Sequence, residues 1–158
     1  MSKAAFVGSF NPFTIGHDRI VRRAARMFGS VVIGVVGDQV NKPGMPSAEE
    51  RAATIRACYA GETGIEVKTY YGLAVDFARQ EGATCIVKGV RNVRDFEYER
   101  EQADINRRIA DVDTVLLMAE PEVASVSSSM VRELRHFGVD TAPFLPNIPA
   151  DKNDNIQR

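Results

Sequence analysis

One segment of the chain, Ser30 to Gly37, constrains the fold more than any other. It is a continuous run of apolar and small residues rich in valine, and it lacks the alternation of a strand with one face in water. An uninterrupted run of this kind is typical of a strand that is covered on both faces. We therefore expect a parallel sheet with helices packed on either side.

Strand and helix patterns alternate through the rest of the chain. We expect strands over residues 4–7, 30–37, 65–70, 84–88 and 114–118. We expect helices over residues 17–28, 47–58, 73–80, 96–109 and 127–136. Repeated βα units predict an α/β fold with a doubly wound parallel sheet. Ligands in such folds bind beyond the carboxyl ends of the strands.

Composition limits the classes of function. The 158 residues carry 20 basic and 21 acidic side chains, a net charge of −1, which argues against bulk binding to nucleic acid or to a membrane surface. Cys58 and Cys85 lie outside any metal-like spacing, so we expect buried, reduced thiols in a cytoplasmic protein. We find no signal peptide and no apolar run of membrane-spanning length. We expect one domain over residues 1–146 and a polar, frayed tail over 147–158.

The turn from Gly8 to His17 joins the first expected strand to the first expected helix. Its sequence is Gly-Ser-Phe-Asn-Pro-Phe-Thr-Ile-Gly-His. A helix N-terminus presents unpaired N–H groups and a partial positive charge, and it therefore attracts phosphate. The turn is suited to hold phosphate with the imidazole of His17 beside it. The alternative is that His17 only caps the helix or packs in the core.

Three further segments bring cations or hydroxyl groups to the same expected edge of the sheet. Lys42 follows the strand over 30–37, although most loop lysines are simply solvated. The segment from Lys88 to Glu99 places two cations around a glycine before a helix, which suits phosphate recognition or a charged helix entry. The segment from Ser125 to Glu133 crowds serines at a helix start, where capping alone needs only one.

These motifs resemble those of the nucleotidyltransferase superfamily, and most closely those of its phosphopantetheine adenylyltransferase branch. The first turn is similar to the T-x-G-H form of the superfamily's H-x-G-H signature. Residues 88–99 resemble the branch's Arg-Gly-Leu-Arg…Asp-Phe-Glu-Tyr-Glu segment, with Lys88 in place of the usual arginine. Residues 125–133 resemble its Ile-Ser-Ser-Ser-x-Val-Arg/Lys-Glu motif, with Val126 for isoleucine, and Asn11 stands where the branch usually has aspartate. The resemblance covers residues 4 to 146 and implies a Rossmann-like nucleotidyltransferase fold.

The resemblance implies an adenylyl transfer from ATP to 4′-phosphopantetheine, which gives dephospho-coenzyme A and pyrophosphate in coenzyme A biosynthesis. Magnesium would accompany the ATP, and coenzyme A is a candidate feedback inhibitor. The resemblance also implies a cytoplasmic homohexamer, and it suggests no nucleic-acid or membrane partner.

The resemblance assigns roles to particular residues. His17 and Lys42 are the expected catalytic residues, His17 at the α-phosphate and Lys42 between the two reacting phosphates. The expected ATP-binding residues are Ser9, Phe10, His17, Gly89, Val90, Arg91, Glu99, Val123, Ala124, Ser125, Val126, Ser127, Ser128 and Ser129. The residues expected to bind the acceptor substrate are Ser9, Lys42, Leu73, Ala74 and Lys88. No residue is assigned to a metal.

Two alternatives stay open at this point. One is another adenylyltransferase of the superfamily, such as the nicotinamide mononucleotide enzyme, although residues 127–133 lack the Thr and Ile-Arg pattern of those enzymes. The other is a nucleotide-binding module without catalysis, which the joint presence of His17, Lys42 and Arg91 disfavours.

Overall fold

The computed structural model describes residues 2–38 and 43–149. Every strand and helix expected from the sequence is present within these ranges. The strands are β1 (Ser2–Gly8), β2 (Gly29–Val36), β3 (Ile65–Tyr70), β4 (Cys85–Val90) and β5 (Asp113–Met118). The helices are α1 (Ile15–Phe28), α2 (Ala48–Cys58), α3 (Ala74–Gln80), α4 (Val93–Ala110) and α5 (Ser128–His136), with short 3₁₀ turns at Pro121–Val123 and Ala142–Phe144. Lys42 and most of the expected tail, residues 150–158, lie outside the described residues.

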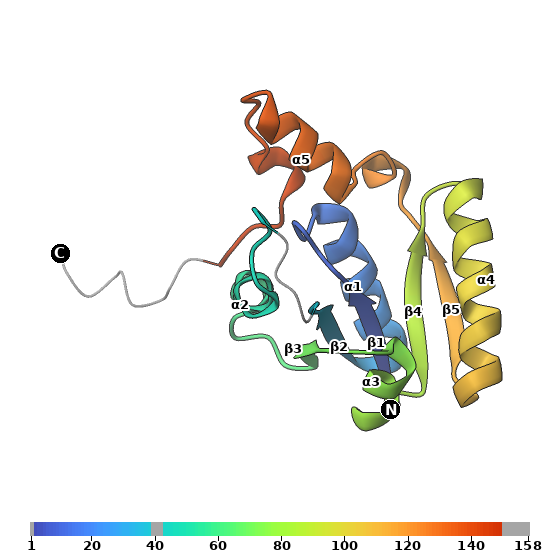
Figure 1. Cartoon of the computed structure of the whole chain (residues 1–158). Helices are drawn as coiled ribbons and strands as arrows, with labels where there is room; N and C mark the ends of the chain where they lie inside the picture. Colours follow the sequence, from blue (N-terminus) through green and yellow to red (C-terminus); the bar gives the residue numbers. More distant parts are fainter. Residues whose placement is uncertain (1, 39–42, 150–158) are drawn as a thin grey trace.

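The five strands form one parallel sheet in the order β3-β2-β1-β4-β5. The chain builds outward from β1 through β2 to β3, and then crosses back to place β4 on the other side of β1. The strand order therefore reverses between β1 and β4. Helix α5 follows the last strand and lies across the carboxyl end of the sheet (Figure 1). This topology is the doubly wound fold that the alternating pattern predicts.

Two helical layers cover the sheet, and alternate residues of the strands face one layer or the other. Ala4 and Phe6 of β1 belong to the core that includes α1 and α2. Ala5 and Val7 belong to the core that includes α3 and the end of α4. The run in β2 is apolar throughout because both of its faces are buried. The expectation of a strand covered on both faces is therefore confirmed.

One glycine in β2 sets how closely a helix approaches the sheet. A Cβ atom at Gly34 would lie 2.4 Å from Cε1 of Phe77, which comes from α3. The Phe77 ring also stacks on Tyr70, with 4.6 Å between the ring centroids. Gly34 therefore provides the space into which the aromatic side chain of α3 packs.

Two helices begin earlier than the apolar pattern suggests, because polar caps fix their first turns. Helix α1 begins at Ile15, two residues before the expected start, with Thr14 as its N-cap. Helix α4 begins at Val93, three residues early, with the side chain of Asn92 accepting from the Asp95 N–H at 2.9 Å. Ser47 and Ser127, the first residues of two expected helices, are the N-caps of α2 and α5.

Both cysteines are buried free thiols, as expected from the sequence. Cys58 and Cys85 are both buried and unpaired, and burial raises the pKa of each thiol. Among residues 2–38 and 43–149, no helix combines the length and apolar character needed to cross a membrane.

Candidate active site

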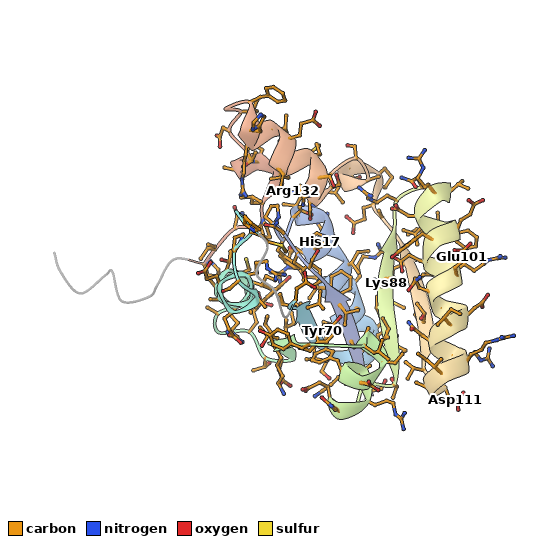
Figure 2. The ribbon with its side chains drawn as sticks, viewed as in Figure 1. His17, Tyr70, Lys88, Glu101, Asp111 and Arg132 are labelled. Carbon is orange, nitrogen blue, oxygen red and sulfur yellow. The ribbon has the colours of Figure 1, made fainter. Side chains whose placement is uncertain are left out.

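A cavity of about 350 Å³ opens at the carboxyl ends of β1 and β4, where the strand order reverses. The beginnings of α1, α4 and α5 complete its walls. Figure 2 shows His17, Lys88 and Arg132 on α1, β4 and α5 around this edge of the sheet. Crevices of this kind, outside the carboxyl ends of parallel strands, are the usual ligand sites of doubly wound folds.

Most of the residues singled out from the sequence meet at this cavity. Those that line it are Ser9, Phe10, His17, Lys88, Gly89, Arg91, Glu99, Val123, Val126, Ser127, Ser128 and Ser129. Val90, Ala124 and Ser125 are neighbours in the chain that do not line it, and Leu73 and Ala74 lie apart at the start of α3. Gly8 and Gly16, in the turn that the sequence analysis singled out, also line the cavity. The lining residues that sequence reasoning missed are Phe6, Val7, Thr14, Ile20, Asp95 and Ala119.

His17 completes the cap of α1. The Thr14 side chain accepts from the His17 N–H at 3.4 Å, and Nδ1 of His17 accepts from the Thr14 N–H at 2.9 Å. This is a capping box in which histidine takes the place usually held by glutamate or glutamine. Nδ1 therefore accepts the hydrogen bond that completes the helix cap, while His17 also lines the cavity. Capping and a role in the cavity are compatible.

Aromatic rings enclose the imidazole of His17. Phe13 stacks on it with 5.3 Å between centroids, and Phe10 meets it edge-on at 5.1 Å. This burial, together with the positive charges of Arg91 and Lys88, lowers the pKa of His17 to about 4. The imidazole is therefore neutral at pH 7. Because Nδ1 accepts a hydrogen bond, the single proton lies on Nε2, which has no hydrogen-bond partner within the described residues.

Lys88 and Glu99 form a loose pair beside His17. The Lys88 Nζ lies 3.6 Å from Oε2 of Glu99, too far for a hydrogen bond. Oε2 of Glu99 is buried and has no hydrogen-bond partner among the described residues. The ammonium group therefore keeps donors available for an anion, and the carboxylate keeps an acceptor available for a donor on a ligand.

Arg91 is held by Asp95, a residue that sequence reasoning missed. The Nε of Arg91 donates to Asp95 at 2.9 Å, Nη2 donates at 3.3 Å, and the Arg91 N–H donates at 3.1 Å. Burial acts to raise the pKa of Asp95, but the hydrogen bonds and charge of Arg91 outweigh it and hold that pKa below its usual value. The spacing of four residues on a helix entry was the signal for this pair.

The serines at the start of α5 have different partners. Ser127 caps the helix by accepting from the Met130 N–H at 3.1 Å. The Ser128 hydroxyl donates to the carbonyl of Pro12 at 2.8 Å, and Arg132 donates to the carbonyl of Asn11 at 2.6 Å. The start of α5 is thus fastened to the turn after β1. Within the described part of the chain, the N–H groups of Ser128 and Ser129 donate no main-chain hydrogen bond, as is usual for a helix N-terminus.

The described residues contain no cluster of three or more His, Cys, Asp or Glu side chains placed to hold a metal ion. The carboxylates in the cavity are Asp95, which binds Arg91, and Glu99, which faces Lys88. This donor set does not form a protein cage for a hard cation, which needs several oxygen ligands.

A parallel sheet with a helix N-terminus and a neutral histidine at its switch point is the arrangement of a Rossmann-like nucleotide-binding protein. In agreement, the sequence model of the Cytidylyltransferase-like family matches residues 5–134. Solved structures of low sequence identity share the fold. A bifunctional NMN adenylyltransferase/ADP ribose pyrophosphatase from Francisella tularensis has a TM-score of 0.68 at 15% identity, over 94% of this chain and 46% of its own. A putative nicotinate-nucleotide adenylyltransferase from Vibrio parahaemolyticus has a TM-score of 0.63 at 14% identity, over 93% of this chain and 88% of its own.

Curated relatives are much more similar in sequence. A phosphopantetheine adenylyltransferase of Porphyromonas gingivalis is 49% identical over 90% of this chain and 93% of its own. Enzymes of the same name from Phocaeicola vulgatus and Leuconostoc citreum are 47% and 45% identical, over 92% and 96% of this chain and 96% of each relative. The chain belongs to the phosphopantetheine adenylyltransferase family.

Proposed function

We propose that the protein transfers the adenylyl group of ATP to 4′-phosphopantetheine, giving dephospho-coenzyme A and pyrophosphate. The relatives that carry the name of this activity are similar over nearly the whole chain. The observation that carries the proposal is the neutral imidazole of His17, with its Nε2 proton free, in the same cavity as Lys88, Arg91 and the start of α5. These groups together can hold two phosphate-bearing substrates.

The reaction needs no nucleophile from the protein, because a phosphate oxygen of the acceptor attacks the α-phosphorus of ATP in line. Catalysis then consists of placing the two substrates and stabilising the charge that develops between them. His17 suits the second task. A neutral imidazole can donate one hydrogen bond to the α-phosphate, and it carries no charge of its own before or after pyrophosphate leaves.

The cations divide between the two substrates. We assign Arg91 and the first N–H groups of α5 to the β- and γ-phosphates, because Asp95 fixes the Arg91 side chain at the helix entry beside them. We assign Lys88 to the phosphate of the acceptor. Lys42, which lies outside the described residues, is proposed to bridge the two reacting phosphates. Leu73 and Ala74 are proposed to meet the pantetheine arm.

Magnesium enters this scheme with the nucleotide. The described residues offer no cage of oxygen ligands, and Mg²⁺ commonly keeps several waters while binding through substrate phosphates. The substrate is therefore MgATP, with the ion offsetting the charge of the triphosphate.

The nicotinamide mononucleotide alternative has weaker support. The Francisella tularensis structure, which has NMN adenylyltransferase in its name, shares only 15% identity with this chain, a level at which the fold alone is common. The relatives described above, at 45% to 49% identity, all carry the phosphopantetheine name. The acceptor is therefore proposed to be a pantetheine phosphate.

We also propose that the protein is a cytoplasmic homo-oligomer, a hexamer by its family resemblance. Helix α4 has no fully buried residue, and it lies at the outer edge of the sheet beside β5 (Figure 1). Tyr98, Ile105 and Ile109 are more than half exposed, and their spacing places them along one face of the helix. A stripe of this kind suits contact with another copy of the chain. Size-exclusion chromatography with light scattering would give the mass, and a monomer would contradict the proposal.

The test of the reaction is pyrophosphate release from MgATP with a panel of acceptors. We expect turnover with 4′-phosphopantetheine, and little or none with nicotinamide mononucleotide or without an acceptor. Turnover with the mononucleotide alone would favour the alternative enzyme. Binding of ATP without turnover on any acceptor would favour the non-catalytic module.

A further inference from the structure

A buried arginine outside the cavity is joined to the turn that forms the cavity wall. Arg51, on α2, is only 7% exposed. Its Nε donates to the carbonyl of Pro46 at 3.0 Å, and its Nη1 donates to the carbonyl of Val36, at the end of β2, at 3.1 Å. The same Nη1 also donates to the carbonyl of Ser9. One guanidinium group thus ties the turns that follow β1 and β2 to the start of α2.

The bond to Ser9 fixes one particular peptide unit. The Ser9–Phe10 peptide is trans, so its C=O and N–H groups point in opposite directions. Arg51 holds the carbonyl, and the N–H of Phe10 is therefore turned away from Arg51. Ser9 and Phe10 line the cavity whereas Arg51 does not, which leaves the N–H on the cavity side.

This N–H has no hydrogen-bond partner among residues 2–38 and 43–149. Phe10 lies outside the strands and helices, and within the described residues its N–H donates no hydrogen bond. An unpaired main-chain donor is uncommon at a buried position. Such donors are used where a ligand supplies the acceptor, as in oxyanion holes.

The conformation of Phe10 is also unusual and is held from two sides. Its φ of 49° lies in the left-handed region, which costs a residue other than glycine about 1–3 kcal/mol and persists only where its surroundings enforce it. The ring is fixed by Phe6, Phe13 and His17, with centroids 5.1 to 5.4 Å away. The carbonyl side of the same peptide is fixed by Arg51.

We propose that Arg51 is a positioning residue for adenylyl transfer: it holds the Ser9 carbonyl so that the Phe10 N–H donates to a phosphate oxygen of the nucleotide beside His17. The proposal rests on the proposed function, since it needs a phosphate at this place in the cavity. Ser9 and Phe10 are among the residues that the resemblance assigns to ATP, and Arg51 acts through the peptide that joins them. Arg51 itself touches no substrate.

The test compares Arg51→Met with Arg56→Met. Arg56 is a matched control, because it lies on the same helix and donates to a main-chain carbonyl, that of Val67 in β3 at 3.1 Å, away from the cavity. A misplaced transition-state donor costs about 10–100-fold in rate. We therefore expect Arg51→Met to lower kcat by that factor while the KM for ATP stays within about threefold, and Arg56→Met to keep wild-type kcat.

A spectroscopic measurement reports the donor directly. In protein labelled with ¹⁵N-phenylalanine, the Phe10 amide, assigned with a Phe10→Leu sample, should shift when a non-hydrolysable ATP analogue binds. The shift should be present in Arg56→Met and lost in Arg51→Met. A wild-type amide that does not respond to the nucleotide would overturn the proposal, as would an Arg51→Met kcat equal to that of Arg56→Met.

If circular dichroism shows that Arg51→Met is unfolded, Arg51→Lys tests the proposal in its place. Lysine keeps the charge but lacks the planar fork that reaches several carbonyls, so kcat should fall by about fivefold or more, and a wild-type kcat would overturn the proposal. If the wild-type protein shows no turnover on any acceptor, the proposed function fails, and the amide shift with the nucleotide analogue still judges the role of Arg51.

Discussion

Replacing His17 by glutamine separates its two roles. Its Nδ1 accepts from the Thr14 N–H and completes the cap of α1, while its Nε2 carries the proton that we assign to catalysis. Glutamine at this position is the usual partner in a capping box, so it can accept from Thr14. It cannot place a donor where the imidazole Nε2 lies. His17→Gln should therefore keep the helix cap and lose the catalytic donor, whereas His17→Ala loses both.

The contacts of His17 allow the losses in free energy of unfolding and in kcat to be estimated. Loss of the ring removes contacts with Phe10 and Phe13, each worth about 0.5–1.5 kcal/mol. Alanine also leaves the Thr14 N–H unpaired, at a further cost of about 1–3 kcal/mol. We expect the free energy of unfolding to fall by about 1–3 kcal/mol in His17→Gln and by about 2–6 kcal/mol in His17→Ala. Loss of one transition-state donor should lower kcat about 10²–10³-fold in both.

The assays are urea unfolding and pyrophosphate release with MgATP and 4′-phosphopantetheine. Glu50→Ala is the control, because Glu50 completes the capping box of α2 by accepting from the Ser47 N–H at 3.3 Å, away from the cavity. It should lose about 1 kcal/mol of stability and keep its kcat. If His17→Gln retained a kcat near that of the wild type, the catalytic assignment would be refuted and His17 would be a cap alone.

Three other changes test the structure further. Because the pKa of His17 is lowered to about 4 from 6.5, the unfolded chain binds its proton more readily. The contribution of neutral His17 to the free energy of unfolding is therefore complete above pH 6.5 and is lost as the pH falls toward 4. Between pH 7 and 5, the free energy of unfolding of the wild type should fall by up to about 2 kcal/mol more than that of His17→Gln, as measured by urea unfolding. Gly34→Ala should lower the free energy of unfolding by about 1–3 kcal/mol, because its Cβ would meet Phe77 at 2.4 Å; unchanged urea midpoints would contradict this. Lys88→Ala should raise the KM for 4′-phosphopantetheine about 10–100-fold, since a charged hydrogen bond is worth about 1.5–3 kcal/mol. Lys88→Arg keeps the charge beside Glu99 and should retain most of the affinity. An alanine variant with the KM of the parent would show that Lys88 does not bind the acceptor.

The helices and strands and their order along the chain follow from local patterns in the sequence. Apolar runs and helical periodicity are local properties, so strands such as β2 and helices such as α2, with its cap at Ser47, could be assigned without the fold. Alternation of strand and helix then implied parallel strands with the conspicuous turns at one edge. For this reason His17, Lys88 and Arg91 could be expected to meet, and they do line one cavity.

The helix starts show where local reasoning was incomplete. Thr14 and Asn92 cap α1 and α4 before the apolar pattern begins. Both are residue types that favour N-caps, so the signal was present in the sequence and was outweighed by the later apolar residues.

The protonation state of His17 and the contacts that hold the site in place depend on the folded chain. The pKa of His17 depends on aromatic rings and cations from β4 and the turn after β1, and burial by distant segments leaves no local pattern. In the sequence Arg51 is one more charged residue of a helix, yet packing encloses it and directs it to carbonyls up to 42 residues away. The contact between Gly34 and Phe77 likewise exists only once α3 lies on the sheet. These properties depend on which segments come into contact in the folded protein, and long-range packing determines those contacts.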